Sequence, residues 1–458
     1  MSPAAPLAVP ASPASSKRSR SKDSTRSAAT SSLLATPALN TPFLTPSASA
    51  PSLLIPSPAE LPMIEPSASD PTPHPAFLRL SRPELHQKFV DLEWEHRRRG
   101  LQGNGQSEAE PSPWSRCTWE DALPRNRYAN VDPYQANRVK LDVPEGQNDY
   151  INASPIELKS SQSGAVLKYI ATQGPKNDTY SHFWRMVWNE TSDPAVIVML
   201  TQTHESGREK CYPYYPPSPA HPDLKLNAED EYEDGFIHDL RLASLEEHAE
   251  SRAQFRDLEM SDAEGSKTKK ISHLLFGAWP DFSVPEGPDR EALLRLIDIS
   301  REKTGDLANP RIVHCSAGVG RSGTFIALDW LLQELSEGSL DNVPDEKDPV
   351  ISVVEKLREQ RMMMVQGEAQ LAFIYDVLRQ RWRERWIQQH PEEAEALGIS
   401  VISGGDGSEE PSLKRQKSMA SSEGTSVSIM NNGSDSQERA QLEAELMDAE
   451  HDFEKGKT

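Results

Sequence analysis

Hydrophobic and polar positions follow regular periods only in the middle of the chain, from Phe77 to Trp386. Short continuous apolar runs in this window predict strands at Lys168–Thr172, Ala195–Thr201 and Arg311–His314. Apolar residues at helical spacing predict helices at His182–Trp188, Arg290–Ile299 and Thr324–Leu335. Strands and helices are mixed along the chain. We therefore expect an α/β (or α+β) fold with a mixed, highly twisted central sheet flanked by helices.

The two ends of the chain have a different composition. Residues 1–75 are mainly Ser, Thr, Pro and Ala without a period, and residues 391–458 are polar, acidic and poor in aromatics. Such segments bury too little apolar surface to offset the entropy of ordering, so we expect both to be disordered tails. All nine tryptophans lie in the remaining domain, predicted at 76–390. Within it, the acidic stretch near 223–264 is expected to form an enlarged surface loop or hairpin.

Charge and cysteine content narrow the classes of function. The 458 residues include 49 Lys+Arg and 70 Asp+Glu, a net charge of −21, which disfavours binding to nucleic acid or anionic membranes. Three cysteines are too few for a disulfide framework and fit a reducing compartment. The longest apolar run, Ala195–Leu200, is far shorter than a membrane span, and the start of the chain does not resemble a signal peptide. We expect a soluble, cytoplasmic protein.

Both tails carry short motifs. Thr36, Thr41, Thr45 and Ser57 each precede a proline, and basic residues cluster at Lys17–Lys22 and Lys414–Lys417, the latter just before Ser418. Regulatory phosphorylation, weak nuclear import and chance clusters in disordered tails all remain open readings.

The most informative segment is Val313–Thr324, with the sequence VHCSAGVGRSGT. An apolar strand leads into it and an apolar-periodic helix leaves it, with two glycines, Gly318 and Gly320, in the loop between them. Such a loop can turn its backbone N–H groups toward one centre at a helix N-terminus, where a phosphate binds. Arg321 adds a planar fork that can bind two phosphate oxygens. The fold prediction thus includes a phosphate-binding loop between a strand and a helix.

The same field of donors acts on Cys315. A thiol at a helix N-terminus amid hydrogen-bond donors is favoured as the thiolate, which is a nucleophile. A buried, inert cysteine is the alternative. The whole string favours the nucleophile, because a bare Cys-x5-Arg would be weak support.

These residues resemble the signature of the cysteine-based protein tyrosine phosphatase family. Seven further blocks match the family in the expected order: Asn126–Val131, Arg138–Leu141, Asp149–Ser154, Ala171–Pro175, Lys210–Cys211, Trp279–Phe282 and Gln366–Gln370. The resemblance is to the non-receptor, fungal-like members, and it covers the core of the chain and neither tail.

The resemblance implies a role for each block. Asp281 would be the general acid and then the general base, on a loop anchored by Trp279, and Ser322 would donate its hydroxyl to the departing thiolate. The implied catalytic residues are Cys315, Arg321, Asp281, Ser322 and Gln366. The implied substrate-binding residues are Tyr128, Asn130, Lys210, Ser316, Ala317, Gly318, Val319, Gly320, Arg321 and Gln370.

Other matched positions have supporting or uncertain roles. Glu205 and Lys210 resemble the partners of the signature arginine and of the acid loop, with solvated surface charges as the alternative. His314 is expected to orient the loop rather than act as a base, and Arg138 and Asn152 are expected to be structural.

Two positions depart from the family or vary within it. Gly367 stands where the family usually has Thr, which puts the role of Gln366 in some doubt. Asn130 stands where members carry Asp or Asn, and the asparagine lacks a negative charge.

The expected activity is hydrolysis of phosphotyrosine on proteins through a cysteinyl-phosphate, without a metal or other cofactor, in intracellular signalling. A phosphotyrosine-binding scaffold and a dual-specificity phosphatase are the alternatives; the Asn126–Tyr128 block and the long domain argue against the latter. We expect a monomer whose partners are phosphotyrosine proteins, with mitogen-activated protein kinases as candidates by analogy only. The protein would be cytoplasmic, with nuclear import as a further option.

The assignment of the tail predicts the effect of truncation. Removing the chain after about residue 395 should leave the rate on a phosphotyrosine peptide nearly unchanged, because no block of the resemblance lies there. Steady-state kinetics with circular dichroism checks this. A folded truncated protein that loses most of its peptide activity would contradict the assignment.

Overall fold

The computed structural model describes residues 72–104, 112–280 and 283–399. All of them belong to one of two compact units, Pro62–Thr458, and the other unit, Met1–Leu61, lies outside the described residues. The basic clusters, the Ser/Thr-Pro pairs and most of the predicted tails also lie outside them. The domain boundaries at 75 and 390 therefore stay predictions.

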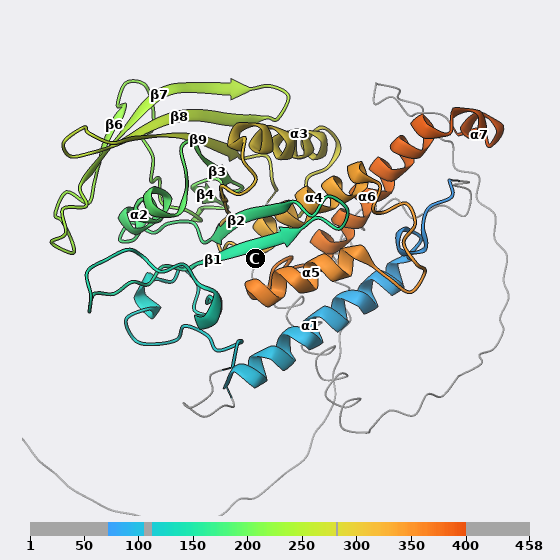
Figure 1. Cartoon of the computed structure of the whole chain (residues 1–458), viewed down its shortest axis with the longest axis horizontal. Helices are drawn as coiled ribbons and strands as arrows, with labels where there is room; N and C mark the ends of the chain where they lie inside the picture. The colour runs from blue at the N-terminus through green and yellow to red at the C-terminus, as the bar shows by residue number, and fades with distance from the viewer. Residues whose placement is uncertain (1–71, 105–111, 281–282, 400–458) are drawn as a thin grey trace, which may run out of the picture. The chain divides into compact units, whose positions relative to one another are not determined.

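The centre of the described fold is an eight-stranded mixed sheet (Figure 1). Its strands lie in the order β1 (Ala153–Lys159), β2 (Val166–Thr172), β10 (Arg311–His314), β3 (Ala195–Met199), β9 (Thr268–Phe276), β8 (Ala253–Asp262), β7 (His238–His248) and β6 (Asp223–Leu226). Strands β2, β10, β3 and β9 run parallel to one another, and the remaining pairs are antiparallel. A separate small hairpin pairs β4 (His204–Glu205) with β5 (Arg208–Glu209).

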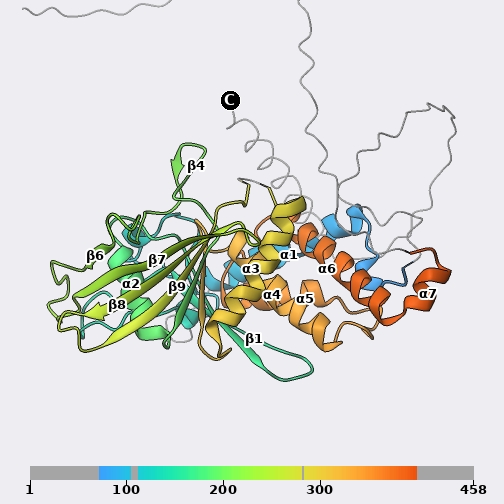
Figure 2. The same cartoon turned by 90° about the horizontal axis from the view of Figure 1, so that it is seen from above.

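Helices cover both faces of this sheet (Figure 2). One core cluster joins one face to α1 (Arg82–Asn104), α3 (Gly287–Thr304), α4 (Gly320–Glu337), α5 (Pro349–Gln360), α6 (Glu368–Gln389) and α7 (Pro391–Ala396). The other cluster joins the opposite face to α2 (Tyr180–Glu190). Short 3-10 turns lie at Ala76–Leu78, Leu123–Arg125 and Gln135–Asn137.

Strand β10 is central because it delivers the chain to the predicted loop. Its side chains are buried on both faces, with Ile312 in one cluster and Val313 in the other, which is why the strand reads as a continuous apolar run. At its start, Arg311 forms a buried ion pair with Asp329 of α4, and the Tyr169 hydroxyl of β2 donates to the same carboxylate at 2.6 Å. These contacts fix β10 and α4 relative to each other on either side of the loop.

The α/β prediction is confirmed. The three predicted helices lie within α2, α3 and α4, and the predicted strands coincide with β2, β3 and β10, although β3 ends two residues earlier than expected. The acidic stretch 223–264 forms the three antiparallel strands β6, β7 and β8 of the central sheet, with a loop of residues 227–236 between β6 and β7. Leu240 and Leu242 of β7 and Leu258 and Met260 of β8 alternate inward, so the stretch has one apolar face despite its charge.

Order continues past residue 390. Ala394 of α7 and Ile399 are buried in the core cluster. A truncation that spares this packing therefore ends after residue 399 rather than 395. None of the described helices carries an apolar segment long enough to cross a bilayer.

Because His238 is buried, we predict that the stability of the fold depends on pH. The ring contacts Phe236 and Trp188 at centroid distances of 4.2 and 4.4 Å, and neither ring nitrogen has a hydrogen-bond partner among the described residues. Burial lowers the pKa of His238 to about 4, although Asp262 opposes the fall. The unfolded chain takes up a proton near pH ~6.5. The free energy of unfolding should therefore fall as pH decreases from about 6.5 to 4.

Urea unfolding at pH 7, 5.5 and 4.5 measures this loss, and His238→Phe should make it shallower. Burial also lowers the pKa of His314 to about 4, so part of the slope should remain in the variant. An identical slope in both proteins would contradict the role given to His238.

Candidate active site

The predicted loop, residues 315–319, lies between the end of β10 and the first residue of α4. Gly318 has φ +74°, and a Cβ there would lie 2.1 Å from the carbonyl oxygen of Thr172. Only glycine fits this position, because both the backbone conformation and the space exclude a side chain. The loop therefore turns sharply at the helix N-terminus.

Each carbonyl of the loop binds a donor outside it. The acceptors and donors are Cys315 O with His314 Nδ1 at 3.1 Å, Ser316 O with Gly174 N at 2.9 Å, Ala317 O with Arg361 Nη2 at 3.1 Å, Gly318 O with Arg361 Nε at 2.9 Å and Val319 O with Val365 N at 3.2 Å. In a trans peptide the N–H points opposite to the C=O. The amides of residues 316 to 320 are thus directed away from these donors and toward the loop interior, as an anion cradle requires.

Cys315 lies at the floor of this cradle. Its Sγ accepts a hydrogen bond from the Gly318 amide at 3.2 Å, and the residue is 5% exposed. Ser322, in the first turn of α4, is fully buried, and its hydroxyl has no hydrogen-bond partner in the described part of the chain. An unpaired buried hydroxyl is costly, so its retention is consistent with a role in the reaction.

Arg321 is held by a carboxylate. Its Nη1 and Nη2 donate to the two oxygens of Glu205 at 2.6 and 2.9 Å, and Nη1 also donates to Leu200 O. Burial opposes ionisation of Glu205, but the hydrogen bonds from Arg321, Thr201 and Gln202 outweigh it, so the pKa of this carboxyl is lowered. The pairing of Glu205 with Arg321 is thus observed, and the solvated-charge alternative is wrong for Glu205.

Tyr128 forms one wall beside the loop. Its hydroxyl lies 2.7 Å from Ser316 Oγ, which in turn donates to the carbonyl of Lys210 at 2.9 Å. The side chain of Lys210 is half-buried, and Asn130 is exposed at the rim. Tyr128, Ser316 and Lys210 are therefore brought together at the loop.

The predicted acid, Asp281, lies outside the described residues together with Phe282, so the flanks of their loop are what the structure places. Trp279 is 3% exposed and donates from Nε1 to Ser283 O at 2.9 Å, so it links the two flanks to each other. Arg321 Nη2 reaches Pro280 O at 3.5 Å, which brings the start of this loop to the cradle.

The two glutamines occupy the N-terminus of α6. Gln370 Oε1 accepts from the amides of Gln366 and Gly367 at 3.0 and 3.4 Å. The amide group of Gln370 also lies against Gly320, where an added Cβ would be 2.9 Å from Gln370 Nε2. Gln366 is exposed. Gly367 has an extended backbone and open space around it, so its lack of a side chain leaves the turn intact.

Arg361 was not predicted from the sequence. It is fully buried and also donates to Asn152 Oδ1 at 2.7 Å and Ser154 Oγ at 3.3 Å. Burial lowers its pKa to about 10, so it remains charged at neutral pH. The only signal was an arginine followed directly by the apolar run Met362–Val365. Asn152 is structural, as expected, and its role is to hold Arg361.

His314 is part of a buried chain of hydrogen bonds. Its Nε2 lies 2.7 Å from the Tyr214 hydroxyl, which lies 2.9 Å from His273 Nε2. With the pKa of His314 lowered to about 4 by burial, the ring is neutral at pH 7 and its Nδ1–H donates to Cys315 O. This arrangement supports the orienting role expected for His314. Arg138 binds Asp149 at 2.7 and 3.0 Å away from the cradle, as expected for a structural residue.

A strand–loop–helix anion cradle with a cysteine at its floor defines a cysteine-dependent phosphate-binding domain. The profile of the protein-tyrosine phosphatase family matches residues 122–380, more than half of the chain. The chain belongs to this family.

Relatives and solved structures agree with this assignment. Tyrosine-protein phosphatase 2 of Schizosaccharomyces pombe is 36% identical over 322 residues, which cover 67% of this chain and 40% of the relative. Tyrosine-protein phosphatase 1 of Saccharomyces cerevisiae is 37% identical over 272 residues, covering 55% and 80%. A structure of PTPN18 in complex with HER2 phosphopeptides superimposes with a TM-score of 0.53 at 28% identity, covering 65% and 93%. The chain thus spans well under half of the first relative's length.

Because Gly318 is tightly packed, we predict that adding one methyl group at this position weakens anion binding. Gly318→Ala should weaken binding of tungstate, a phosphate analogue, by at least about tenfold, because the loss of a hydrogen bond to a charged group costs ~1.5–3 kcal/mol. Gly305→Ala is the matched control, since Gly305 has φ +69° with open space around it. Both variants incur the left-handed penalty of roughly 1–2 kcal/mol in unfolding free energy.

Calorimetry with tungstate and urea unfolding measure the two effects. Only Gly318→Ala should lose binding and show the additional destabilisation caused by the clash with Thr172. Equal tungstate affinities in the two variants would show that the cradle tolerates the methyl group.

Proposed function

We propose that the protein hydrolyses phosphotyrosine on protein substrates through a cysteinyl-phosphate intermediate. The observation that carries the proposal is the outward hydrogen bonding of all five loop carbonyls, residues 315 to 319, which directs five amides toward the site of a phosphate. Preorganised donors of this kind stabilise the charge that develops on the transferring phosphoryl group without reorganising during the reaction. The guanidinium of Arg321, held by Glu205, adds a positive charge beside the loop.

In the first step the Cys315 thiolate attacks phosphorus. The Sγ–P bond forms, the bond from phosphorus to the tyrosyl oxygen breaks, and that oxygen takes a proton from Asp281. The role of Asp281 rests on the family resemblance. The burial of Trp279 and its bond to Ser283 support it, because they anchor the loop that carries the acid.

In the second step a water attacks the phosphoenzyme. The ionised Asp281 takes the proton, the P–S bond breaks, and the Ser322 hydroxyl donates to the departing thiolate. The unpaired, fully buried hydroxyl of Ser322 supports this role, since nothing else in the described part of the chain uses it. Gln366 and Gln370 position the water, with Gln370 held by its two backbone hydrogen bonds.

Selection for phosphotyrosine follows from the depth of the slot. Tyr128 forms a wall beside Ser316, so a phosphate must reach past the tyrosine to meet the cradle. A phosphoserine or phosphothreonine side chain is too short for that distance, which disfavours the dual-specificity alternative. PTPN18, a structural neighbour, has been solved with phosphotyrosine-containing peptides, which supports the same substrate class here. Asn130 would bind the substrate backbone without adding a negative charge to the rim.

The physiological role is a further part of the proposal. Mitogen-activated protein kinases are the candidate substrates, by analogy with fungal members of the family, within intracellular signalling. The tails would act in regulation, with the basic clusters at 17–22 and 414–417 serving nuclear import of a protein that is otherwise cytoplasmic. A phosphoproteome of cells expressing Asp281→Ala, which should retain bound substrates, tests the substrate. Fluorescent fusions lacking each basic cluster test the location.

Replacement of the nucleophile tests the activity itself. Cys315→Ser should lower kcat to below about a thousandth of wild type, because a hydroxyl is not ionised in this site at neutral pH. The assay is hydrolysis of p-nitrophenyl phosphate with a chelator present, followed by matched phosphotyrosine and phosphothreonine peptides. The wild-type protein should cleave the first peptide and leave the second intact. Cleavage of both peptides at similar kcat/KM would favour the dual-specificity alternative, and binding without turnover would favour the scaffold.

A further inference from the structure

The acidic loop between β6 and β7, residues 227–236, has a conformation fixed by internal hydrogen bonds. It carries five acidic residues in ten positions. Asn227 Nδ2 donates to Phe236 O at 2.8 Å and closes the loop at its base. The carboxylate of Asp230 accepts from the amides of Asp234 and Gly235 at 3.2 and 3.1 Å. These bonds give the loop a defined conformation from which its side chains can act on neighbouring elements.

Two carboxylates attach the loop to helix α2. Asp234 forms a bidentate pair with Arg185 at 2.6 and 2.9 Å, and the guanidinium of Arg185 lies 4.1 Å from the centre of the Phe236 ring. Glu231 Oε2 lies 2.7 Å from His182 Nε2 on the preceding turn of the same helix. Burial opposes ionisation of Glu231, but the contacts with His182 and Arg125 outweigh it and lower the pKa of this carboxyl.

The third attachment of the loop is to Arg125, which lies just before Tyr128 of the substrate wall. Tyr232 is 6% exposed, and its hydroxyl accepts a hydrogen bond from Arg125 Nη2 at 2.8 Å. Glu231 Oε1 lies 3.4 Å from the same nitrogen. Arg125 Nη1 donates to Tyr150 O and Asn148 O at 2.7 and 3.0 Å. The guanidinium of Arg125 thus lies between the backbone of Asn148 and Tyr150 on one side and the acidic loop on the other.

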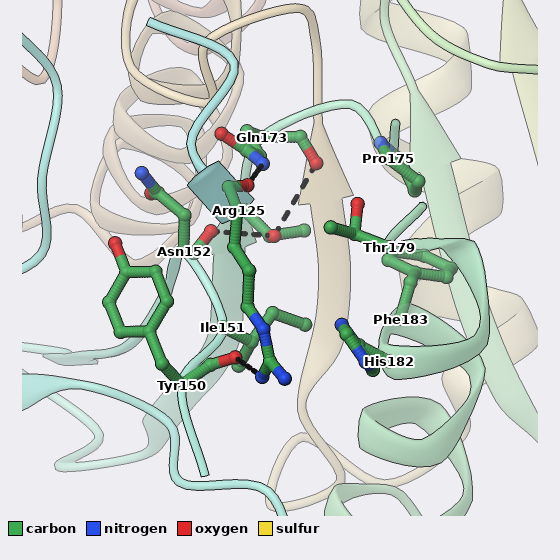
Figure 3. Close-up of a pocket in the computed structure, with 10 residues that line it drawn as sticks. Arg125, Tyr150, Ile151, Asn152, Gln173, Pro175, Thr179, His182 and Phe183 are labelled. Carbon is green, nitrogen blue, oxygen red and sulfur yellow. Dashed lines mark hydrogen bonds between the residues drawn. The ribbon is translucent and has the colours of Figure 1, made fainter. Parts of the chain in front are cut away.

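Arg125 is also part of the backbone that leads to Tyr128. Its carbonyl accepts from Gln173 Nε2 at 2.8 Å, and Gln173 Oε1 accepts from the Arg127 amide at 2.8 Å. Figure 3 shows Arg125 extending from Gln173 down to Tyr150, with His182 on the other side of the small pocket. The backbone of this segment and the side chain of Arg125 are therefore fixed by two independent sets of contacts.

We propose that the acidic loop 227–236 is a positioning element for the Tyr128 wall of the substrate slot, acting through Tyr232 and Arg125. The proposal rests on the proposed phosphotyrosine phosphatase function. A docking surface for a basic partner is the competing reading of so many acids. The loop contacts disfavour it, because Asp230, Glu231 and Asp234 are engaged within the domain and only Glu229 and Glu233 of this loop are left for a partner.

Tyr232→Phe removes the hydroxyl and keeps the ring, which packs beneath Arg185 at 5.1 Å. We expect KM for a phosphotyrosine peptide to rise by about three- to tenfold, the range that corresponds to one ordinary hydrogen bond because the wall is displaced only indirectly, with kcat unchanged within about twofold. A displaced wall weakens binding of the ring without altering the cradle. Tyr375→Phe is the matched control, since it removes a buried hydroxyl bonded to Asp348 at 2.6 Å on α6, outside the slot.

A double-mutant cycle tests whether Tyr232 acts through Arg125. In an Arg125→Met background, Tyr232→Phe should add no further change in KM, whereas independent roles would give the full change again. If Tyr232→Phe does not fold by circular dichroism, Glu231→Gln replaces it, with an expected rise of about twofold in KM from the weaker contact to Arg125.

An unchanged KM in the folded variant, an equal change in Tyr375→Phe, or a full additional change in the Arg125→Met background would overturn the proposal. Wild-type turnover in the same assay, with Cys315→Ser as the blank, separates this result from failure of the proposed function. If the wild type is no more active than the blank, the function itself is wrong.

Discussion

The arrangement of the site depends on the direction of five consecutive peptide groups. A loop that aims its amides at one point concentrates partial positive charge there, and the chain does not adopt this conformation unless each carbonyl finds a donor on the other side. The donors come from β10 itself, from the segment after β2, and from the segments around residues 361 and 365. The strand order β2–β10–β3 and the packing of α4 with α5 and α6 bring these segments around the loop.

The same constraint explains why the domain contains costly buried charges. Arg361 is fully buried, and its hydrogen-bond partners among the described residues are carbonyls, an amide and a hydroxyl rather than a carboxylate. Burial of an ion without an opposite charge is unfavourable, which is reflected in its pKa of about 10. The cost is offset because the guanidinium satisfies two loop carbonyls at once. Nearby Tyr150, Cys315 and Asp132 favour its charged form in return.

Support for the site extends outward through successive hydrogen-bonded contacts. Glu205 holds Arg321, and Gln173 holds the segment leading to Tyr128. The acidic loop adds a third layer in which carboxylates act as structural acceptors, attaching α2 and Arg125 to one another. A strongly acidic surface segment is therefore compatible with a site that binds dianions, because three of its five carboxylates serve as hydrogen-bond acceptors within the domain.

Local sequence patterns predicted the loop at 315–319 and the strand and helix that flank it, whereas tertiary contacts determined which residues surround it. The stretch from Val313 to Thr324 determined the strand, the loop and the helix, since a buried parallel strand, two glycines and an apolar-periodic helix each have a local signature. It also marked Cys315 and Arg321 as candidates for the nucleophile and the phosphate-binding fork, because the two are close together in the chain. The position of the acidic stretch 223–264 was predicted only in part. Its charge suggested a surface element, whereas its alternating leucines placed it in the sheet.

Contacts between distant segments could not be predicted from the sequence. Arg361 donates to Gly318 O across 43 positions, and Tyr232 contacts Arg125 across 107. The local sequence around these residues does not indicate such partners. A buried arginine and a surface one are identical in sequence; the difference arises from which carbonyls the fold leaves without donors. The sequence by itself determined which side chains are candidates for the chemistry, whereas the packing of distant segments determined where the surrounding dipoles point, because the direction of a peptide group depends on its partners and not on its own side chain.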